Sequence, residues 1–246
     1  MKPRVVATIE ARMTSSRLPG KVLLPALGEP MLFHLVRRLR AVTSIDEIVI
    51  ATTVNDSDQP IINFACANEI PVYRGSEENV LERVVGAAEM VNAQLIVEIT
   101  GDCPIIDPTV VDKTIQLFLD SKVDYVSNTL IRSFPDGMDT QVFSLENLKK
   151  SAALTLDPLD LEHVSRFMWQ HPDLFSQLNM LAPPDFYWPE LGLTLDEVDD
   201  YRLLKKIIEE LGPQNILFGC ADVIALLKKN PEWVEINRKV LRKGDS

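Results

Sequence analysis

Val5-Val-Ala-Thr-Ile9 followed by Glu10-Ala-Arg-Met-Thr-Ser-Ser-Arg-Leu-Pro-Gly-Lys21 is the stretch that decides the fold. Its first part is short, apolar and rich in β-branched residues, and it ends in a polar loop. This pattern is typical of a buried strand that delivers a loop. We therefore expect the chain to be organised around this strand and the loop that follows it.

The loop carries three cations, Arg12, Arg17 and Lys21, among small side chains. Arginine grips phosphate oxygens through a planar fork and lysine adds a point charge, so the loop suits a polyphosphate. Pro19 and Gly20 fix a turn that keeps the loop in shape. The spacing matches neither GxxxxGK[ST] nor GxGxxG. A solvated basic loop that binds nothing is the alternative.

Length and composition indicate one large α/β domain that spans residues 1–246. The chain has 246 residues, of which 46% are hydrophobic, enough to bury a full core. No apolar run approaches 18 residues, so no membrane span or membrane partner is expected, and the N-terminus is too short for a signal peptide. Cys66, Cys103 and Cys220 lack CxxC spacing, which fits free thiols in a cytoplasmic protein and argues against a zinc site.

The charge of the chain is uneven. Its net charge of −11 disfavours a nucleic-acid polymer as a partner. Residues 1–40 hold eight lysines and arginines against two acids, a net of +6, so the remainder carries −17. A locally positive segment in an acidic protein fits a small anionic ligand.

Strands and helices are expected to alternate along most of the chain. The patterns predict strands at 5–9, 47–53, 70–73, 94–100, 122–127, 140–143 and 175–181. They predict helices from 30, around 61–65, at 78–91, from 107, at 144–154, through 160–166 and at 197–211, with two shorter ones closing the chain. Alternation with short loops indicates a doubly wound, largely parallel sheet, whose ligands lie beyond the carboxyl ends of the strands.

Two segments are interpreted differently. Residues 128–190 form a looser, turn-rich region that we interpret as an insertion over the mouth of the sheet and not as a separate domain. Arg37, Arg38 and Arg40 lie mostly opposite the apolar side of the first helix, so they are expected to form a solvated face.

Two aspartates, far apart in the chain, each end a strand-like run. Asp102 follows 94–100 beside Gly101, and Asp196 ends Leu193-Thr-Leu-Asp196. Magnesium binds one or two carboxylates together with phosphate oxygens and water, so the pair suits a nucleotide–magnesium site. The alternatives are a turn-forming role for Asp102 and the N-cap of the 197–211 helix for Asp196.

The loop sequence Ala11-Arg-Met-Thr-Ser-Ser-Arg-Leu-Pro-Gly-Lys-Val-Leu23 resembles the signature of the CTP-dependent sugar cytidylyltransferases. These enzymes couple CTP to 3-deoxy-2-ulosonic and sialic-acid-like sugars, and the spore-coat polysaccharide type looks closest. Gly101-Asp-Cys-Pro104 and Leu193-Thr-Leu-Asp196 resemble two further motifs of the family. Glu10 stands where that type usually has glutamine.

The resemblance implies a Rossmann-like nucleotidyltransferase fold and a set of site residues. Arg12, Lys21 and Asp102 would be catalytic, and Asp102 and Asp196 would hold Mg²⁺. The nucleotide would contact Ala11, Arg12, Ser16, Arg17, Lys21, Thr52, Arg74, Ser76 and Asp102. The sugar would contact Asp136 and Asp139, which lie on either side of Gly137 in a turn-rich loop, and His163, which is expected one helical turn from Arg166. The alternative for Ser76 is that it caps a helix.

The predicted reaction is transfer of CMP from CTP to a small sugar acid, with release of pyrophosphate, in surface polysaccharide biosynthesis. One alternative is a sugar-phosphate nucleotidyltransferase that uses another NTP. Another is a non-catalytic nucleotide-binding regulator. The resemblance also implies a homodimer formed through the 128–190 arm.

Overall fold

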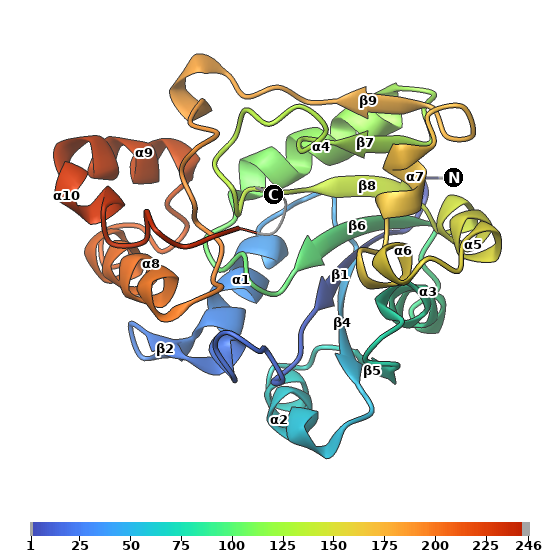
Figure 1. Ribbon diagram of the computed structural model, residues 1–246, viewed down its shortest axis with the longest axis horizontal. Coiled ribbons are helices and arrows are strands. Elements are labelled where there is room, and N and C mark those ends of the chain that lie inside the picture. Colours follow the sequence, from blue (N-terminus) through green and yellow to red (C-terminus); the bar gives the residue numbers. More distant parts are fainter. Residues whose placement is uncertain (1, 243–246) are drawn as a thin grey trace.

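A seven-stranded sheet runs through the middle of the computed structural model, which describes residues 2–242 (Figure 1). The strand order is β5-β4-β1-β6-β8-β7-β9. The strands are β1 (Val5–Glu10), β4 (Glu47–Thr53), β5 (Val72–Gly75), β6 (Leu95–Thr100), β7 (Tyr125–Ser127), β8 (Gln141–Ser144) and β9 (Gln177–Asn179). A small hairpin of β2 (Pro25–Ala26) and β3 (Glu29–Pro30) lies apart from the sheet.

The central strands are parallel and the outer part is mixed. Strand β1 pairs in parallel with both β4 and β6, and β4 pairs in parallel with β5. Strand β8 is antiparallel to β6 and to β7, whereas β9 pairs in parallel with β7 at the sheet edge. The predicted, mostly parallel α/β sheet is therefore confirmed. Strands from both ends of the 128–190 region are built into it.

The helices cover both faces of the sheet. The longer ones are α1 (Met31–Arg40), α2 (Gln59–Ala67), α3 (Val80–Met90), α4 (Pro108–Asp120), α5 (Leu145–Leu154), α8 (Val198–Leu211) and α9 (Cys220–Lys229). Short ones are α6 (Pro158–Glu162), α7 (Arg166–Gln170), α10 (Pro231–Val234) and the 3-10 turns η1 (Lys21–Leu23), η2 (Asp56–Asp58) and η3 (Pro184–Phe186). None of the helices among residues 2–242 is long and apolar enough to cross a bilayer.

Side-chain alternation along the buried strands separates two cores. Val5, Ala7 and Ile9 pack with residues of α1, α2 and α4, whereas Val6 packs with residues of α3, α5 and α7. Successive strand residues point to opposite faces, so a strand that is covered on both sides is apolar throughout. The same alternation places Glu10, two positions from Thr8, on the α3 face of the sheet.

A third core joins the C-terminal helices to the rest of the molecule. Residues of α8 and α9 pack against Met138 and Leu193 from irregular segments. Arg38 of α1 reaches this region, where its Nη1 donates to the Phe218 carbonyl at 2.6 Å and its guanidinium lies over the Phe218 ring. Arg38 is only 1% exposed. The predicted solvated face of three arginines is therefore wrong at this position.

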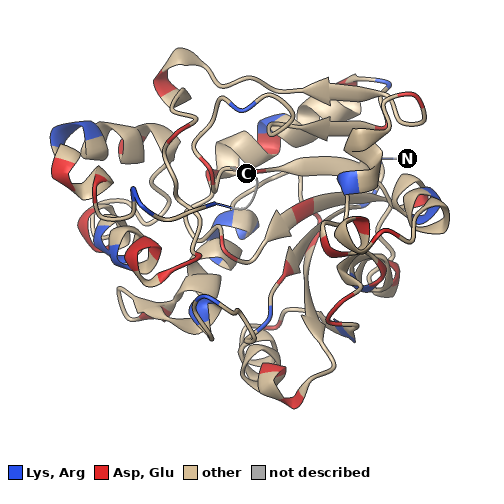
Figure 2. Ribbon diagram, in the orientation of Figure 1, with Lys and Arg blue, Asp and Glu red and all other residues tan. Residues whose placement is uncertain are grey.

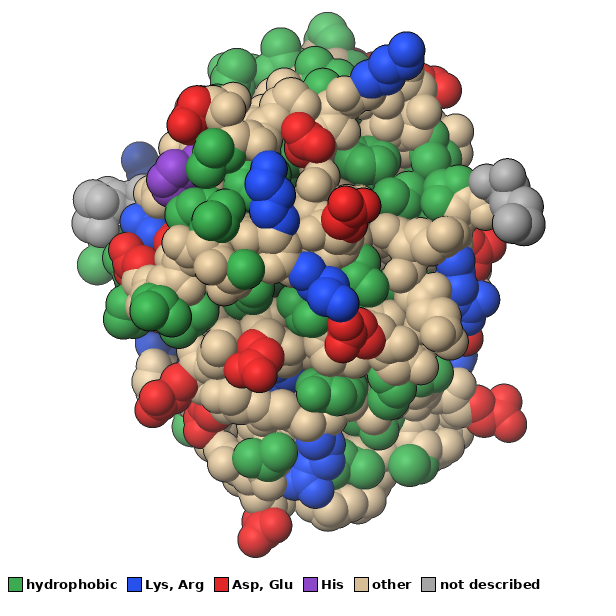
Figure 3. Space-filling model, turned by 90° about the vertical axis from the view of Figure 1, so that its right-hand side faces the viewer, with side chains coloured by type: hydrophobic (Ala, Val, Ile, Leu, Met, Phe, Trp, Pro, Cys, Tyr) green, Lys and Arg blue, Asp and Glu red, His purple; other side chains and the backbone are tan. Residues whose placement is uncertain are grey.

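Acidic and basic side chains are spread over the ribbon in Figure 2, including an acidic residue in each of the adjacent strands β1 and β6. On the surface seen in Figure 3, both signs of charge are interspersed with small groups of hydrophobic side chains. Cys66, Cys103 and Cys220 are free thiols, of which the last two are buried.

Candidate active site

Two adjacent parallel strands, β1 and β6, deliver their carboxyl ends to one edge of the sheet. Strand β1 leads into the 11–21 loop, and its neighbour β6 leads into Gly101 and Asp102. The Gly101 N–H donates to the Glu10 carbonyl at 2.9 Å. A Cβ at Gly101 would lie 2.7 Å from that carbonyl oxygen, so this close approach requires glycine. Asp102 is thereby held beside the start of the loop.

The 11–21 loop is held in shape from both ends. Gly20 adopts a φ of 71°, and its N–H donates to the Met13 carbonyl at 2.9 Å. The Met13 N–H donates to Asp58 Oδ1 at 2.7 Å. Asp58 also accepts hydrogen bonds from the hydroxyls of Thr52 and Thr53, and all three side chains are buried. These hydrogen bonds outweigh burial and lower the pKa of Asp58, which therefore stays ionised under the loop.

The three cations of the loop each meet a carboxylate. Lys21 Nζ lies 3.0 Å from Asp102 Oδ2 and 3.1 Å from Asp196 Oδ1. Arg17 Nη2 lies 2.8 Å from the same Asp196 oxygen. Arg12 Nη1 lies 3.0 Å from Glu77 Oε1, and Glu77 also accepts from Thr14 and Asn55. Lys21 thus joins the two aspartates that the sequence placed at separate strand ends.

The Lys21–Asp102 contact is charged on both sides. Burial disfavours the Lys21 ammonium, but Asp102 and Asp196 outweigh it and raise the pKa of Lys21. Burial likewise disfavours the Asp102 carboxylate, but Lys21 lowers the pKa of Asp102. Lys21 therefore carries its proton and Asp102 lacks one near neutrality.

Asp196 is fixed by its neighbours and does not cap a helix. The Asp196 and Glu197 N–H groups donate to Asp200 Oδ2 at 3.1 and 2.9 Å, and Glu197 is the N-cap of α8. The alternative that made Asp196 the cap is therefore wrong. The Leu195 N–H donates to the Asp102 carbonyl at 2.8 Å, which brings the two segments together.

The donor set fits a magnesium ion that is bound jointly with a nucleotide. Asp102 and Asp196 contact the same lysine nitrogen, so both carboxylates reach one small region. Residues 2–242 contain no group of three or more histidine, cysteine or acidic side chains placed to hold a metal. Magnesium at nucleotide sites takes one or two carboxylates and completes its shell with phosphate oxygens and water.

A cavity of about 250 Å³ lies under the loop, and we call it the loop cavity. Residues that line it include Glu10, Ala11, Arg12, Ser16, Arg17, Lys21, Thr100, Asp102, His163 and Asp196. These include six of the nine residues that the resemblance implied for the nucleotide. The cavity is thus lined by the cationic loop on one side and by the two aspartates on the other.

The structure places three of the implied nucleotide contacts elsewhere. Thr52 is fully buried, and its hydroxyl donates to Asp58. Arg74 donates to the carbonyls of residues 53–55, at 2.7 Å to the Val54 oxygen. Ser76 Oγ accepts from the Asn79 N–H, and Asn79 is the N-cap of α3, so the alternative that made Ser76 the helix cap is wrong. Among residues 2–242, none of these three side chains belongs to the lining of the cavities at this edge of the sheet.

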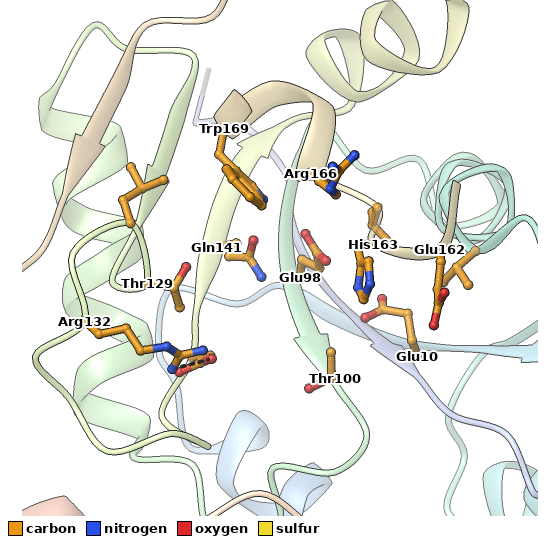
Figure 4. A pocket seen from close by; sticks show the side chains of 14 residues that line it. Glu10, Glu98, Thr100, Thr129, Arg132, Gln141, Glu162, His163, Arg166 and Trp169 are labelled. Atoms are coloured by element: carbon orange, nitrogen blue, oxygen red, sulfur yellow. Dashed lines mark hydrogen bonds and ion pairs between the residues drawn. The ribbon is translucent and has the colours of Figure 1, made fainter. Parts of the chain in front are cut away.

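A second and larger cavity, which we call the side cavity, adjoins the loop cavity. Its volume is about 500 Å³, and it shares Glu10, Thr100, His163 and two further residues with the loop cavity. Strands β1, β6 and β8 form its floor, and α6, α7 and the segment between them cover it (Figure 4). The two cavities together offer room for two ligands that meet near Glu10 and His163.

His163 reaches these cavities from a break between helices. Helix α6 ends at Glu162, and α7 begins at Arg166, because Val164 has a φ of 36°. The predicted single helix through 160–166 is therefore wrong, and His163 and Arg166 do not lie one turn apart on it. Arg166 Nη1 forms an ion pair with Asp160 on α6 at 2.5 Å.

The other implied sugar contacts, Asp136 and Asp139, lie in one loop and contact different parts of the molecule. Asp139 lines the side cavity, and burial and the charge of Asp136 raise its pKa to about 7. Asp136 instead accepts from the Thr194 hydroxyl at 3.2 Å. Arg132 Nη1 bridges the two aspartates, 3.4 Å from an oxygen of each.

The C-terminal segment also reaches the site, which no feature of the sequence indicated. Arg17 Nη1 donates to the Leu241 carbonyl at 2.8 Å. Arg242 donates to the Thr194 hydroxyl and forms an ion pair with the fully buried Asp200 at 3.0 Å. Residues 241 and 242 therefore support both the cationic loop and the segment that carries Asp196.

A cationic loop and two aspartates at the carboxyl edge of a parallel sheet define a nucleotide-binding α/β enzyme. Comparison with protein families narrows this class. Residues 6–207 match the family model described as Cytidylyltransferase. The chain belongs to this cytidylyltransferase family and is a nucleotidyltransferase of Rossmann-like fold.

Individual relatives agree over nearly the whole chain. The spore coat polysaccharide biosynthesis protein SpsF of Bacillus subtilis is 34% identical over 233 residues, which cover 93% of this chain and 95% of that protein. A cytidylyltransferase structure from Leptospira borgpetersenii has a TM-score of 0.90 at 30% identity and covers 98% and 100% of the two chains.

A structure of CMP:2-keto-3-deoxy-manno-octonic acid synthetase complexed with CTP shares the fold. Its TM-score is 0.62 at 18% identity, over 84% of this chain and 99% of that one.

Proposed function

We propose that this enzyme transfers CMP from CTP to a hydroxyl group of a sugar acid and releases pyrophosphate. The observation that carries the proposal is the convergence of Arg17, Lys21, Asp102 and Asp196 beside a second cavity. The names of several relatives support cytidine as the base and a sugar acid as acceptor, because these relatives are 3-deoxy-manno-octulosonate cytidylyltransferases. The similarity to SpsF supports a role in polysaccharide biosynthesis.

In the loop cavity, Arg12, Arg17 and Lys21 would bind the triphosphate, with Ala11 and Ser16 beside them. The acceptor hydroxyl oxygen bonds to the α-phosphorus, the bond to the bridging oxygen of the leaving group breaks, and pyrophosphate leaves with that electron pair. The hydroxyl proton is released. Cations that are already in place stabilise the charge that develops on the leaving group, and alignment of the two ligands supplies the rest.

Asp102 and Asp196 would hold Mg²⁺ on the nucleotide. The ion would neutralise charge on the phosphate oxygens. Lys21, which contacts both carboxylates, would turn its ammonium towards the phosphates. Three protein groups would thus surround the reacting phosphate.

The acceptor would occupy the side cavity, with His163 and Asp139 in its wall. His163 lines both cavities, so it is placed where the acceptor and the nucleotide meet. Asp136 would act indirectly, through its ion pair with Arg132 and its hydrogen bond with the Thr194 hydroxyl.

The test is pyrophosphate release from each of the four NTPs with Mg²⁺ and a panel of 2-keto-3-deoxy sugar acids and sugar phosphates. We expect release with CTP and a sugar acid. Release with another NTP and a sugar phosphate would move the function to a different nucleotidyl transfer. CTP binding without release from any pair would instead support a nucleotide-binding regulator.

A further inference from the structure

The floor of the side cavity holds two buried carboxyl groups on adjacent strands. The register pairs Thr8 with Glu98 and Glu10 with Thr100. Alternate residues of a strand share a face, so Glu10 and Glu98 lie diagonally across β1 and β6 on the same face of the sheet. Both line the side cavity. Figure 4 shows Glu10, Glu98, Thr100 and His163 arranged around the open space.

Three of the four oxygens of these carboxyl groups lack hydrogen-bond partners among the described residues. Both oxygens of Glu10 and Oε2 of Glu98 are buried without a partner among the described residues, and Glu98 is only 5% exposed. Most buried polar atoms in proteins are paired, and unpaired ones are costly. Three such oxygens at the floor of one cavity therefore indicate a ligand that donates hydrogen bonds to them.

The basic side chains around the cavity are engaged by other groups. Arg166 is paired with Asp160, and Arg132 bridges Asp136 and Asp139. Arg83 does not line the side cavity; it favours the ionised form of Glu10 from α3, its Nη1 donates to the Ser76 carbonyl, and its Nε is buried without a hydrogen-bond partner among the described residues. Four acids, Glu10, Glu98, Asp139 and Glu162, line the cavity against Arg132, Arg166 and His163.

We propose that the acceptor bound in the side cavity is a sugar that carries a protonated amino group, which Glu10 and Glu98 recognise. An ammonium group has three N–H donors and one positive charge, so it can donate to the unpaired oxygens of both carboxyl groups and favours their ionised forms. The proposal rests on the proposed function, because it names the acceptor class for that site. A sugar acid that also carries an amino group agrees both with the proposed function and with this inference.

The protonation of Glu10 and Glu98 offers a second measurable property that should change on ligand binding. Burial and the charge of Glu98 raise the pKa of Glu10 well above its usual range, and burial raises the pKa of Glu98 to about 8. The carboxyl pair therefore retains protons near neutrality. A ligand ammonium favours the ionised forms, so its binding releases protons into the buffer.

The test is titration calorimetry with the full chain, Mg²⁺ and α,β-methylene CTP, which blocks turnover. The probes are 3-deoxy-manno-octulosonate and analogues in which the hydroxyl at C4, C5, C7 or C8 is replaced in turn by an amine or an acetamide. We expect one amine to bind at least tenfold more tightly than both the parent sugar and its acetamide. Its binding should also release protons, measured in buffers of different ionisation enthalpy.

Matched variants identify the recognising groups. Glu98→Gln and Glu10→Gln should each reduce the amine preference below threefold, whereas Glu146→Gln, an exposed position on α5, should retain it. Thermal unfolding checks that each variant folds, and either variant alone is sufficient for the comparison. Equal binding of all amines, parent and acetamides, or a preference that survives in both variants, would overturn the proposal.

The two proposals fail in different ways. If α,β-methylene CTP does not bind to the wild-type chain, the proposed function fails. If it binds and the sugar acids bind without an amine preference, only the amino-group inference fails. Better binding of the hydroxylated parent would identify a neutral polyol face as the feature that the carboxyl pair recognises.

Discussion

The loop cavity and the side cavity meet at Glu10 and His163, but they are built in different ways. The loop cavity is formed by strand ends, where β1 and β6 lead directly into the cationic loop and Asp102. The side cavity is roofed by two short helices and by the irregular segment that contains Asp139. Under the proposed function, the strand ends would bind the phosphates that all nucleotides share, whereas the side cavity, with its strand floor and irregular roof, would supply the contacts that distinguish one acceptor from another.

The largest effect on catalysis is expected from substitution of Asp102, which follows β6 and lines the loop cavity. Asp102→Asn removes the charge that pairs with Lys21 and that would hold the metal, so kcat/KM should fall by about 10³-fold. Steady-state pyrophosphate release measures this fall, and thermal unfolding should show a folded protein. Asp120→Asn, an exposed position at the end of α4, is the control. Turnover within threefold of wild type would refute the metal assignment of Asp102.

A smaller loss is expected at Lys21. Lys21→Met leaves Asp102 and Asp196 without their shared cation and removes a phosphate contact, so kcat/KM for CTP should fall by about 10²-fold. The same assay with Lys228→Met, exposed on α9, separates this from a general loss of charge. An unchanged kcat/KM would show that the loop cavity does not bind the triphosphate through Lys21.

Substitution of Asp58 tests how much its hydrogen bonds to the 11–21 loop and to β4 stabilise the fold. Asp58→Asn weakens charge-assisted hydrogen bonds to Met13, Thr52 and Thr53, so the free energy of unfolding should fall by about 2 kcal/mol. The folded-state pKa of Asp58 is lowered, so its contribution is present above the unfolded pKa of about 3.9 and is lost as the pH falls through the folded pKa.

Urea unfolding at pH 7 and at decreasing pH measures both effects. The difference between wild type and Asp58→Asn should narrow as the pH falls below about 4. Asp56→Asn, exposed in the same turn, is the matched control. A difference that stays constant with pH would show that the carboxylate charge is not what holds the loop.

The smallest effect is expected at Arg74. Its guanidinium donates to backbone carbonyls of residues 53–55 and lines neither cavity, so Arg74→Ala should change the KM for CTP by less than about threefold. Arg202→Ala, exposed on α8, is the comparison. A tenfold rise in KM for CTP would restore Arg74 to the nucleotide contacts that the sequence motif implied.

The regular half of the molecule could be predicted because its signals are local. The apolar run at 5–9, the alternating strands and the polar residues at their ends depend only on neighbours in the chain. Asp102 and Asp196 could be paired because both end strand-like runs, and the structure brings both to Lys21. The resemblance to the family motif identified the 11–21 loop, which supplies the lysine that contacts both aspartates.

The remainder depends on contacts between distant parts of the chain. The burial of Arg38 against the Phe218 carbonyl cannot be read from helical periodicity, which places charged residues outside. The roles of Asp58 and Asp200 depend on backbone N–H groups brought to them by folding. The break at Val164 likewise overrides a helical pattern, because tertiary packing outweighs local propensity there.

The contact between Leu241 and Arg17 has a practical consequence for handling the protein. An affinity tag fused after residue 246 would begin a few residues from a backbone carbonyl that supports the cationic loop. A tag before residue 1 would instead precede β1, whose six residues place Val5 roughly 17 Å from the active edge. Assays of nucleotide binding are therefore best made with the N-terminal fusion.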